Sequence, residues 1–122
     1  MSDVRQKIME LREESLKGGR VSSPEKAVIS AAIFTALRCE PCYKAYLTIA
    51  HELGADLDYV VEVFSLVMNA QGCVGDVWGA RAIEFFKHLQ SGKIKAESVL
   101  DSMCDILNPE RMANLIASIQ PE

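Results

Sequence analysis

The stretch SPEKAVISAAIFTALRCEPCYKAYLTIAHELG, residues 23–54, decides the fold. Its apolar residues recur with helical rather than strand spacing, in two runs separated by a short break. The first run, Ala27 to Leu37, is apolar nearly all round, which is typical of a helix at the centre of a core or under a second subunit. The second run, Pro41 to Leu53, is followed by a glycine, a common helix stop. Both runs therefore predict helices.

The start of the first of these helices carries a capping signal. Ser22 is placed to accept from the amide of Glu25, and the Glu25 side chain is placed to reach back to Ser22. Pro24 suits the first helical turn because its φ is fixed and its missing N–H would have no partner there. We therefore expect a capping box at this end.

The segment before residue 20 predicts a separate amphipathic helix. Val4, Ile8 and Leu11 fall at positions i, i+4 and i+7 of a charged segment. Gly18 and Gly19 follow it and give the chain freedom to turn. We therefore expect an amphipathic helix with these three residues on its apolar face.

The second half of the chain also has helical spacing. Asp56 or Asp58 can cap a helix that runs through Gln71. The valines of this segment would also suit a strand, but the segment is too long for one. The sequence then predicts a loop with Gly72 and Gly75, followed by helices over 77–90, 96–107 and 109–119. The expected fold is all-α: one compact domain, residues 1–122, of about seven helices.

Composition limits the classes of function. The chain has 122 residues, 49% hydrophobic content and a net charge of -4 that is spread along it. No basic stripe exists to release counterions from a phosphate backbone, so no nucleic-acid partner is expected. We find no signal peptide and no apolar run long enough for a membrane span, and four cysteines without such a signal indicate a reducing, cytoplasmic location.

The motif Cys39-Glu40-Pro41-Cys42 sets two thiols three positions apart where a loop becomes a helix. Residues at i and i+3 on a helical turn lie side by side, close enough for a disulfide when the first cysteine lies at the helix end. The helix dipole and the free amides of the first turn favour a thiolate, the reactive form. The spacing therefore suits a reversible disulfide.

Two other interpretations of the cysteine pair stay open at this point. The thiols could be inert and buried, since cysteine is among the residues most often buried. They could also bind a metal ion, although structural zinc needs a further pair, and Cys73 and Cys104 are single and far apart in the sequence. Cys73 is the better candidate for a third accessible thiol.

From Ser23 to about Phe86 the chain resembles the AhpD-like, carboxymuconolactone decarboxylase superfamily. The resemblance consists of an apolar helix, C-x-x-C at the next helix start, Gly54-Ala55 after that helix, and an acidic helix start followed by Glu62. The glycines at 72 and 75 agree with it as well. It covers about half of the chain, and its specificity lies in the order and spacing of these features.

The resemblance implies a redox site at Cys39 and Cys42 but not the family's proton relay. The family has a Glu where this chain has Ala27 and a His where it has Tyr46. Tyr46 lies at i+4 from Cys42, so its hydroxyl could donate a hydrogen bond to a thiolate. It is a poor base, because an unperturbed phenol with a pKa of about 10 stays protonated at neutral pH.

The remaining polar candidates have weaker functional signals. His51 is nine residues after Cys42, which places it on the opposite face of the helix and predicts a surface or interface residue. His88 belongs to a different helix from the motif, and Glu62 on a helix is most often simply solvated.

The segments Ala27 to Leu37 and Val60 to Met68 are apolar enough to need cover by other subunits, which predicts a homo-oligomer, a trimer or hexamer. Small members of the resembled family also assemble in this way. The expected electron donor is a partner dithiol such as a thioredoxin-like or lipoyl-bearing protein. The resemblance implies no flavin, other cofactor or metal. The expected function is a thiol-disulfide oxidoreductase or weak alkylhydroperoxidase with an antioxidant role. A cofactor-free decarboxylase and a non-catalytic oligomeric binding protein are the alternatives.

Overall fold

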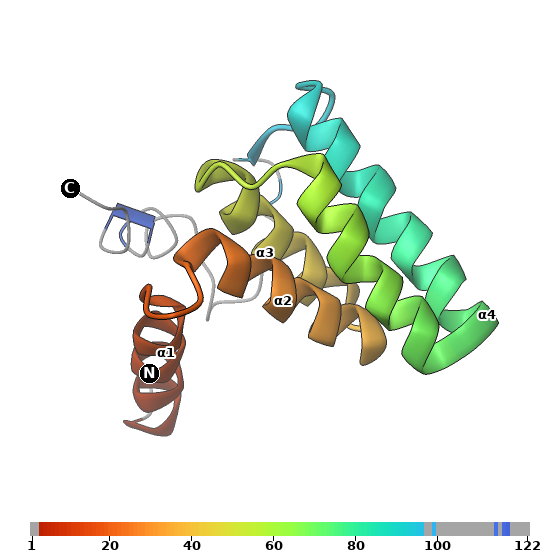
Figure 1. Cartoon of the computed structure of the whole chain (residues 1–122). Coiled ribbons are helices and arrows are strands. Elements are labelled where there is room, and N and C mark those ends of the chain that lie inside the picture. The colour runs from red at the N-terminus through yellow and green to blue at the C-terminus, as the bar shows by residue number, and fades with distance from the viewer. Residues whose placement is uncertain (1–2, 97–98, 100–113, 115, 118–122) are drawn as a thin grey trace.

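The computed structural model describes residues 3–96, 99, 114, 116 and 117. Four helices make up most of this part, and no strand occurs in it: α1 (Asp3–Leu16), α2 (Ser23–Ala36), α3 (Glu40–Glu52) and α4 (Leu57–Gln90) (Figure 1). The all-α expectation is confirmed for the described residues. The helices expected over 96–107 and 109–119 lie almost wholly outside them, so the expected count of about seven helices is not confirmed.

The core lies where α2 and α3 pack against each other and against α4 (Figure 1). Small side chains on α2 let α3 approach closely, and large apolar side chains from α3 and α4 fill the space between the helices. Among the fully buried residues are Ala27, Val28, Leu47, Ile49 and Phe86. One side of the apolar run in α2 thus lies in the core, as expected, and the other side is exposed.

The helix ends follow the sequence signals closely. The amide of Glu25 donates to the Ser22 hydroxyl (3.3 Å) and the Ser22 amide donates to the Glu25 carboxylate (3.1 Å), which completes the capping box. Asp56, rather than Asp58, caps α4 by accepting from the amide of Tyr59 (2.8 Å). Gly54 follows α3 with φ +89°, a conformation that favours glycine.

Helix α4 is a hairpin of two arms rather than one straight rod (Figure 1). The chain reverses at Gly72 (φ 61°, ψ -135°), so the expected loop between Gly72 and Gly75 shrinks to a single non-helical residue. The arms touch at Gly75, where an added Cβ would collide with the carbonyl oxygen of Val67. A glycine is needed at 75 because two backbones approach each other there.

By length and apolar composition, α4 resembles a membrane-spanning helix, with a mean hydropathy of 1.2 over its most apolar window. A core helix of a soluble protein can have the same composition, so this signal is weak. The reversal at Gly72 also leaves each arm shorter than the roughly 20 residues that a spanning helix needs.

Helix α1 forms as expected, but its apolar stripe is exposed. Val4 and Leu11 are 66% and 67% exposed, and Ile8 is also exposed, whereas Met9 and Leu16 are buried. The apolar stripe of α1 therefore points away from the rest of the described chain. The periodicity predicted the helix correctly, but periodicity alone does not say which partner covers its apolar face.

Candidate functional site

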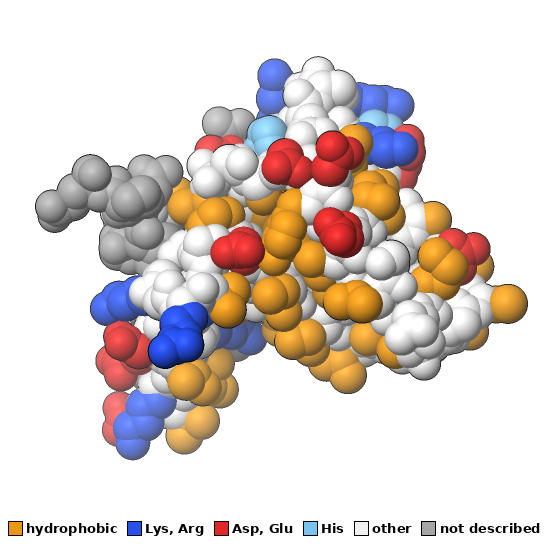
Figure 2. All heavy atoms as spheres, viewed as in Figure 1, with side chains coloured by type: hydrophobic (Ala, Val, Ile, Leu, Met, Phe, Trp, Pro, Cys, Tyr) orange, Lys and Arg blue, Asp and Glu red, His pale blue; other side chains and the backbone are white. Residues whose placement is uncertain are grey.

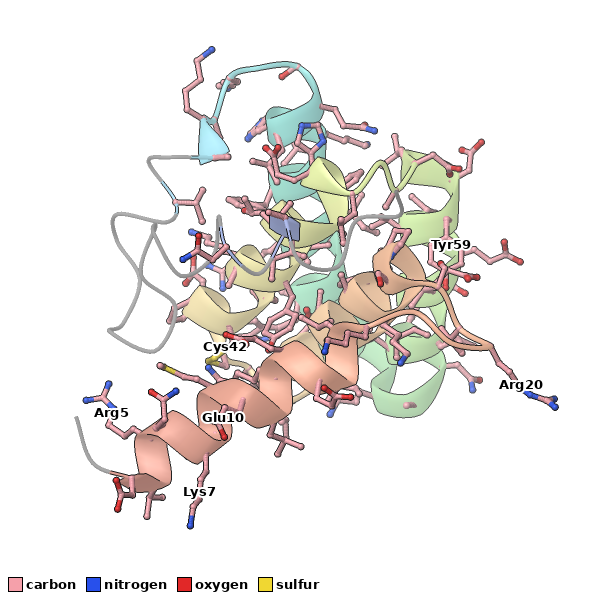
Figure 3. All side chains as sticks on the ribbon, turned by 90° about the vertical axis from the view of Figure 1, so that its left-hand side faces the viewer. Arg5, Lys7, Glu10, Arg20, Cys42 and Tyr59 are labelled. Atoms are coloured by element: carbon pink, nitrogen blue, oxygen red, sulfur yellow. A yellow bond between two sulfur atoms is a disulfide. The ribbon has the colours of Figure 1, made fainter. Side chains whose placement is uncertain are left out.

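Cys39 and Cys42 form a disulfide at the start of α3, with their Cα atoms 5.3 Å apart (Figure 3). Cys39 is the N-cap residue, in an extended conformation, and Glu40 and Pro41 begin the helix, one residue earlier than the sequence suggested. This placement brings the two sulfurs together because the first cysteine stands just outside the helical turn that carries the second. Both cysteines are partly exposed.

The loop before the disulfide is a tight helix stop built on an unusual residue. The amide of Cys39 donates to the carbonyl of Phe34 (2.9 Å) and the amide of Arg38 donates to that of Thr35 (3.0 Å), which is a Schellman motif. Arg38 occupies its left-handed position with φ 59°. Glycine is the usual residue there, and a side chain costs roughly 1–2 kcal/mol.

Tyr46 lies one turn beyond Cys42 on α3 and is only 4% exposed. Its ring packs against Phe34 of α2, with ring centroids 5.2 Å apart. Burial raises the pKa of Tyr46, and the charge of the Arg12 guanidinium opposes that rise. The phenol is therefore held in its protonated form, so it can act as a hydrogen-bond donor and not as a base at neutral pH.

Arg12 is a neighbour of this site that the sequence did not reveal. It comes from α1, and its Nη1 atom is buried without a hydrogen-bond partner among the described residues. Its charge nevertheless reaches the Tyr46 hydroxyl. No local pattern could have indicated this approach, because Arg12 and Tyr46 are on separate helices and meet only through the tertiary fold.

The position that carries Glu in the resembled family is fully buried here. Ala27 has 0% exposure and belongs to the core between α2 and its neighbours. A carboxylate at this position would need a partner inside the protein, since an unpaired buried charge is costly. At positions 27 and 46 the site therefore carries an alanine and a protonated phenol, and neither group can accept a proton at neutral pH.

The other predicted residues are not gathered around the disulfide. His51 is half-buried, and its ring lies edge-on to that of Phe86 with the ring centroids 6.0 Å apart. Its ring therefore contacts the core. Glu62 is exposed, and Cys73 is an exposed free thiol that lies in the second arm of α4 instead of a loop. Cys104 lies outside the described residues. His88 pairs with Glu84 (3.1 Å) on the second arm of α4.

Among the described residues no three His, Cys, Asp or Glu side chains gather in a way that would hold a metal ion. Comparison of the chain with protein-family models, with curated proteins and with solved structures finds no match.

Proposed function

We propose that this protein is a thiol-disulfide oxidoreductase in which Cys39 and Cys42 alternate between dithiol and disulfide. The observation that supports the proposal is the disulfide at the N-terminus of α3, between two partly exposed cysteines. A structural disulfide gains most when it closes a long loop, whereas this one joins residues three positions apart. A reactive role therefore explains the pair better than a stabilising one.

The proposed reaction with a peroxide has two steps. One thiolate attacks a peroxide oxygen, the O–O bond breaks, and the leaving alkoxide takes a proton to become an alcohol, which leaves a sulfenic acid on the sulfur. The second thiolate attacks that sulfur, the S–O bond breaks, and the leaving hydroxide takes a proton to become water, so that the disulfide forms. A partner dithiol, of the thioredoxin-like or lipoyl-bearing class, then returns two electrons and two protons.

With a disulfide substrate, a thiolate attacks one substrate sulfur, the S–S bond breaks, and the other sulfur leaves as a thiolate that takes a proton from solvent, which leaves a mixed disulfide on the protein. The second cysteine resolves this intermediate. The route needs less from a proton relay than peroxide reduction does, because a thiolate is a better leaving group than an alkoxide. The buried Ala27 and the protonated Tyr46 therefore favour disulfide over peroxide as the substrate class.

Turnover assays test the proposal. Protein supplied with a dithiol reductant should reduce a small organic disulfide, and it should reduce an organic hydroperoxide more slowly. Cys39→Ser and Cys42→Ser should each abolish turnover, whereas Cys73→Ser, which removes the exposed free thiol, should leave it unchanged. Equal rates in the Cys42→Ser variant and the wild type would contradict the proposal.

A double variant tests the reason for slow peroxide chemistry. Ala27→Glu with Tyr46→His would place a carboxylate and an imidazole at the two buried positions. If the missing relay limits the rate, hydroperoxide reduction should rise by about 100-fold, the low end of general acid-base effects. An unchanged rate in a folded double variant, verified by circular dichroism, would show that a different step is limiting.

We also propose a homo-oligomer, a trimer or hexamer, in the cytoplasm. The support is the apolar surface over α2 and the first arm of α4, together with the separate stripe on α1 (Figure 2). On α2 and α4, Ile33, Leu37 and Leu66 are 56%, 69% and 63% exposed. Soluble monomers rarely leave patches of this kind uncovered. Light scattering that gives a mass near 13.5 kDa would contradict the oligomer.

This surface also favours the second candidate function, a non-catalytic oligomeric binding protein. Both candidate functions predict a homo-oligomer. The binding protein differs from the oxidoreductase because its cysteines would show no turnover. A cofactor-free decarboxylase remains the third alternative, and consumption of an added acidic lactone by the Cys39→Ser variant would favour it.

A further inference from the structure

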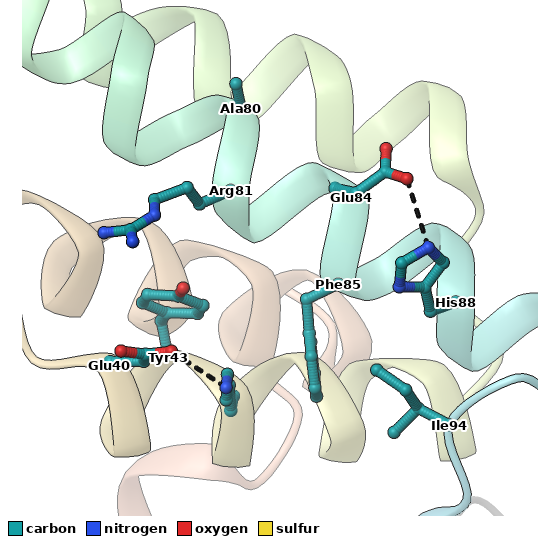
Figure 4. Close-up of a pocket in the computed structure, with 9 residues that line it drawn as sticks. Glu40, Tyr43, Ala80, Arg81, Glu84, Phe85, His88 and Ile94 are labelled. Carbon is teal, nitrogen blue, oxygen red and sulfur yellow. Dashed lines mark ion pairs between the residues drawn. The ribbon is translucent and has the colours of Figure 1, made fainter.

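A groove of about 550 Å³ opens between α3 and the second arm of α4 (Figure 4). Its volume lies within the range of about 300–1,000 Å³ that is typical of small-molecule sites. Glu40 and Lys44 line it from α3, and each is two residues from Cys42. At 100° per residue they lie on nearly the opposite face of the helix from that cysteine. The groove is therefore distinct from the disulfide site.

The base of the groove is apolar and aromatic. Tyr43 and Phe85 line it and are themselves buried, and Ile94 closes one end (Figure 4). The Lys44 ammonium lies 5.6 Å from the centre of the Phe85 ring. A ligand with an aromatic or aliphatic body would remove apolar surface from water here, which favours binding by roughly 25 cal/mol per Å².

The charges around the groove comprise two ion pairs and one cation that lies outside the ion pairs of the described residues. Lys44 pairs with Glu40 (2.9 Å), and His88 pairs with Glu84 (3.1 Å). Arg81 also lines the groove but belongs to none of the ion pairs found between described residues. Lys44 lowers the pKa of Glu40, and the Arg81 charge adds a smaller effect in the same direction. The Arg81 guanidinium nevertheless forms no ion pair among the described residues, so its N–H groups can meet an anion from solution.

The position of Arg81 suits recognition of such an anion. Its guanidinium carbon lies 5.2 Å from the centre of the Trp78 ring, within the range of a cation–π contact, which favours one placement of the group. It reaches over the end of the groove where Tyr43 and Glu40 lie (Figure 4). Two N–H groups in one plane match the two oxygens of a carboxylate.

From this arrangement we infer that the groove binds a small monocarboxylate whose charged group pairs with Arg81 and whose apolar body lies on Phe85. A monoanion suits the site better than a phosphate dianion, because Glu40 and Glu84 lie at its two ends and repel added negative charge (Figure 4). This ligand site goes beyond the proposed redox function and does not depend on it.

The chain contains a single tryptophan, Trp78, and its contact with Arg81 makes it a reporter of binding. The test is titration of the oxidised protein with 4-phenylbutyrate, followed by tryptophan fluorescence and, independently, by saturation-transfer NMR on the ligand. Saturable binding is expected. The neutral analogue 4-phenylbutyramide should bind about tenfold or more weakly, because it loses the charge-assisted contact. Inorganic phosphate at the same concentration should not displace the acid.

Two variants complete the test. Arg81→Gln should weaken 4-phenylbutyrate binding by about tenfold or more in the NMR measurement, which does not depend on the tryptophan. Lys87→Gln removes the same charge from an exposed position of the same helix and should change the affinity by less than about twofold. Equal affinity for acid and amide, displacement by phosphate, an unaffected Arg81→Gln variant, or no binding would each overturn the inference.

Discussion

The side-chain amide of Gln71 donates a hydrogen bond to the backbone carbonyl of Ala36, with the nitrogen and oxygen 3.2 Å apart. Gln71 is the last residue before the reversal of α4 at Gly72, and Ala36 is the last residue of α2. The bond satisfies one of the carbonyls that every helix leaves free at its C-terminus. It thereby ties the tip of the α4 hairpin to the loop that leads into the disulfide.

Loss of this tie should loosen that loop. Gln71→Ala should lower the free energy of unfolding by about 0.5–1.5 kcal/mol and increase amide hydrogen exchange at Arg38 and Cys39. Gln90→Ala, at an exposed position of the same helix, is the matched control and should change neither. Unchanged exchange at both amides in the Gln71 variant would show that the bond does not hold the loop.

Arg38 combines backbone strain with a positive charge next to Cys39. Arg38→Gly should raise the free energy of unfolding by about 1 kcal/mol, because glycine adopts φ 59° without the steric cost of a side chain. The same variant should slow alkylation of the reduced protein by about two- to fivefold, since a neighbouring cation favours the thiolate.

Arg38→Lys separates the two effects, because it keeps both the charge and the strain. Its alkylation rate and its stability should stay close to those of the wild type. A slow rate in Arg38→Lys as well would mean that the charge of residue 38 is not the cause.

The close contact of the two α4 arms gives a sharp test of the hairpin. Gly75→Ala should destabilise the fold by about 2–4 kcal/mol, because the new Cβ meets the backbone carbonyl of Val67 and the arms must separate. Gly79→Ala is the control, since its Cβ would lie 4.0 Å from Phe64, an ordinary contact. It should be neutral or stabilise by up to about 1 kcal/mol. Equal denaturation midpoints for the two variants would contradict the antiparallel pairing of the arms.

Tyr46 should make the fold sensitive to alkaline pH. Burial raises the pKa of Tyr46 in the folded protein above its unfolded value, so its contribution to stability is complete below about pH 10 and is lost as pH rises through the folded pKa. Urea denaturation at about pH 8 and about pH 11 should show a smaller loss for Tyr46→Phe than for the wild type. Tyr59→Phe, at a less buried position, should retain most of the wild-type loss. The same loss in Tyr46→Phe as in the wild type would remove Tyr46 as its cause.

Local signals in the sequence predicted the helix ends well. The Ser22–Glu25 capping box and the stop at Gly54 depend on residues a few positions apart, so the pattern contains all that is needed. The choice between Asp56 and Asp58 stayed open, because both types cap helices and only the turn geometry separates them. The placement of Cys39 just outside α3 was predictable for the same local reason.

Features that depend on distant residues were not predictable. Whether Val4 and Leu11 are covered depends on what packs against α1, and their spacing does not contain that information. The approach of Arg12 to Tyr46 joins helices that are far apart in sequence. The expected loop between Gly72 and Gly75 was too long. One residue with positive φ, Gly72, is enough to reverse the helix, because Gly75 has no side chain to collide with Val67 on the other arm.

The most direct test of the redox proposal is peptide mapping after differential alkylation of protein that has been reduced and then treated with a mild oxidant. We predict that Cys39 and Cys42 react with the alkylating agent only in the reduced protein and are recovered as one cross-linked peptide after oxidation. Cys73, the exposed thiol, should be alkylated in both states. Oxidised protein in which Cys39 and Cys42 remain alkylatable, or in which either is linked to Cys73 or Cys104 instead, would contradict the account.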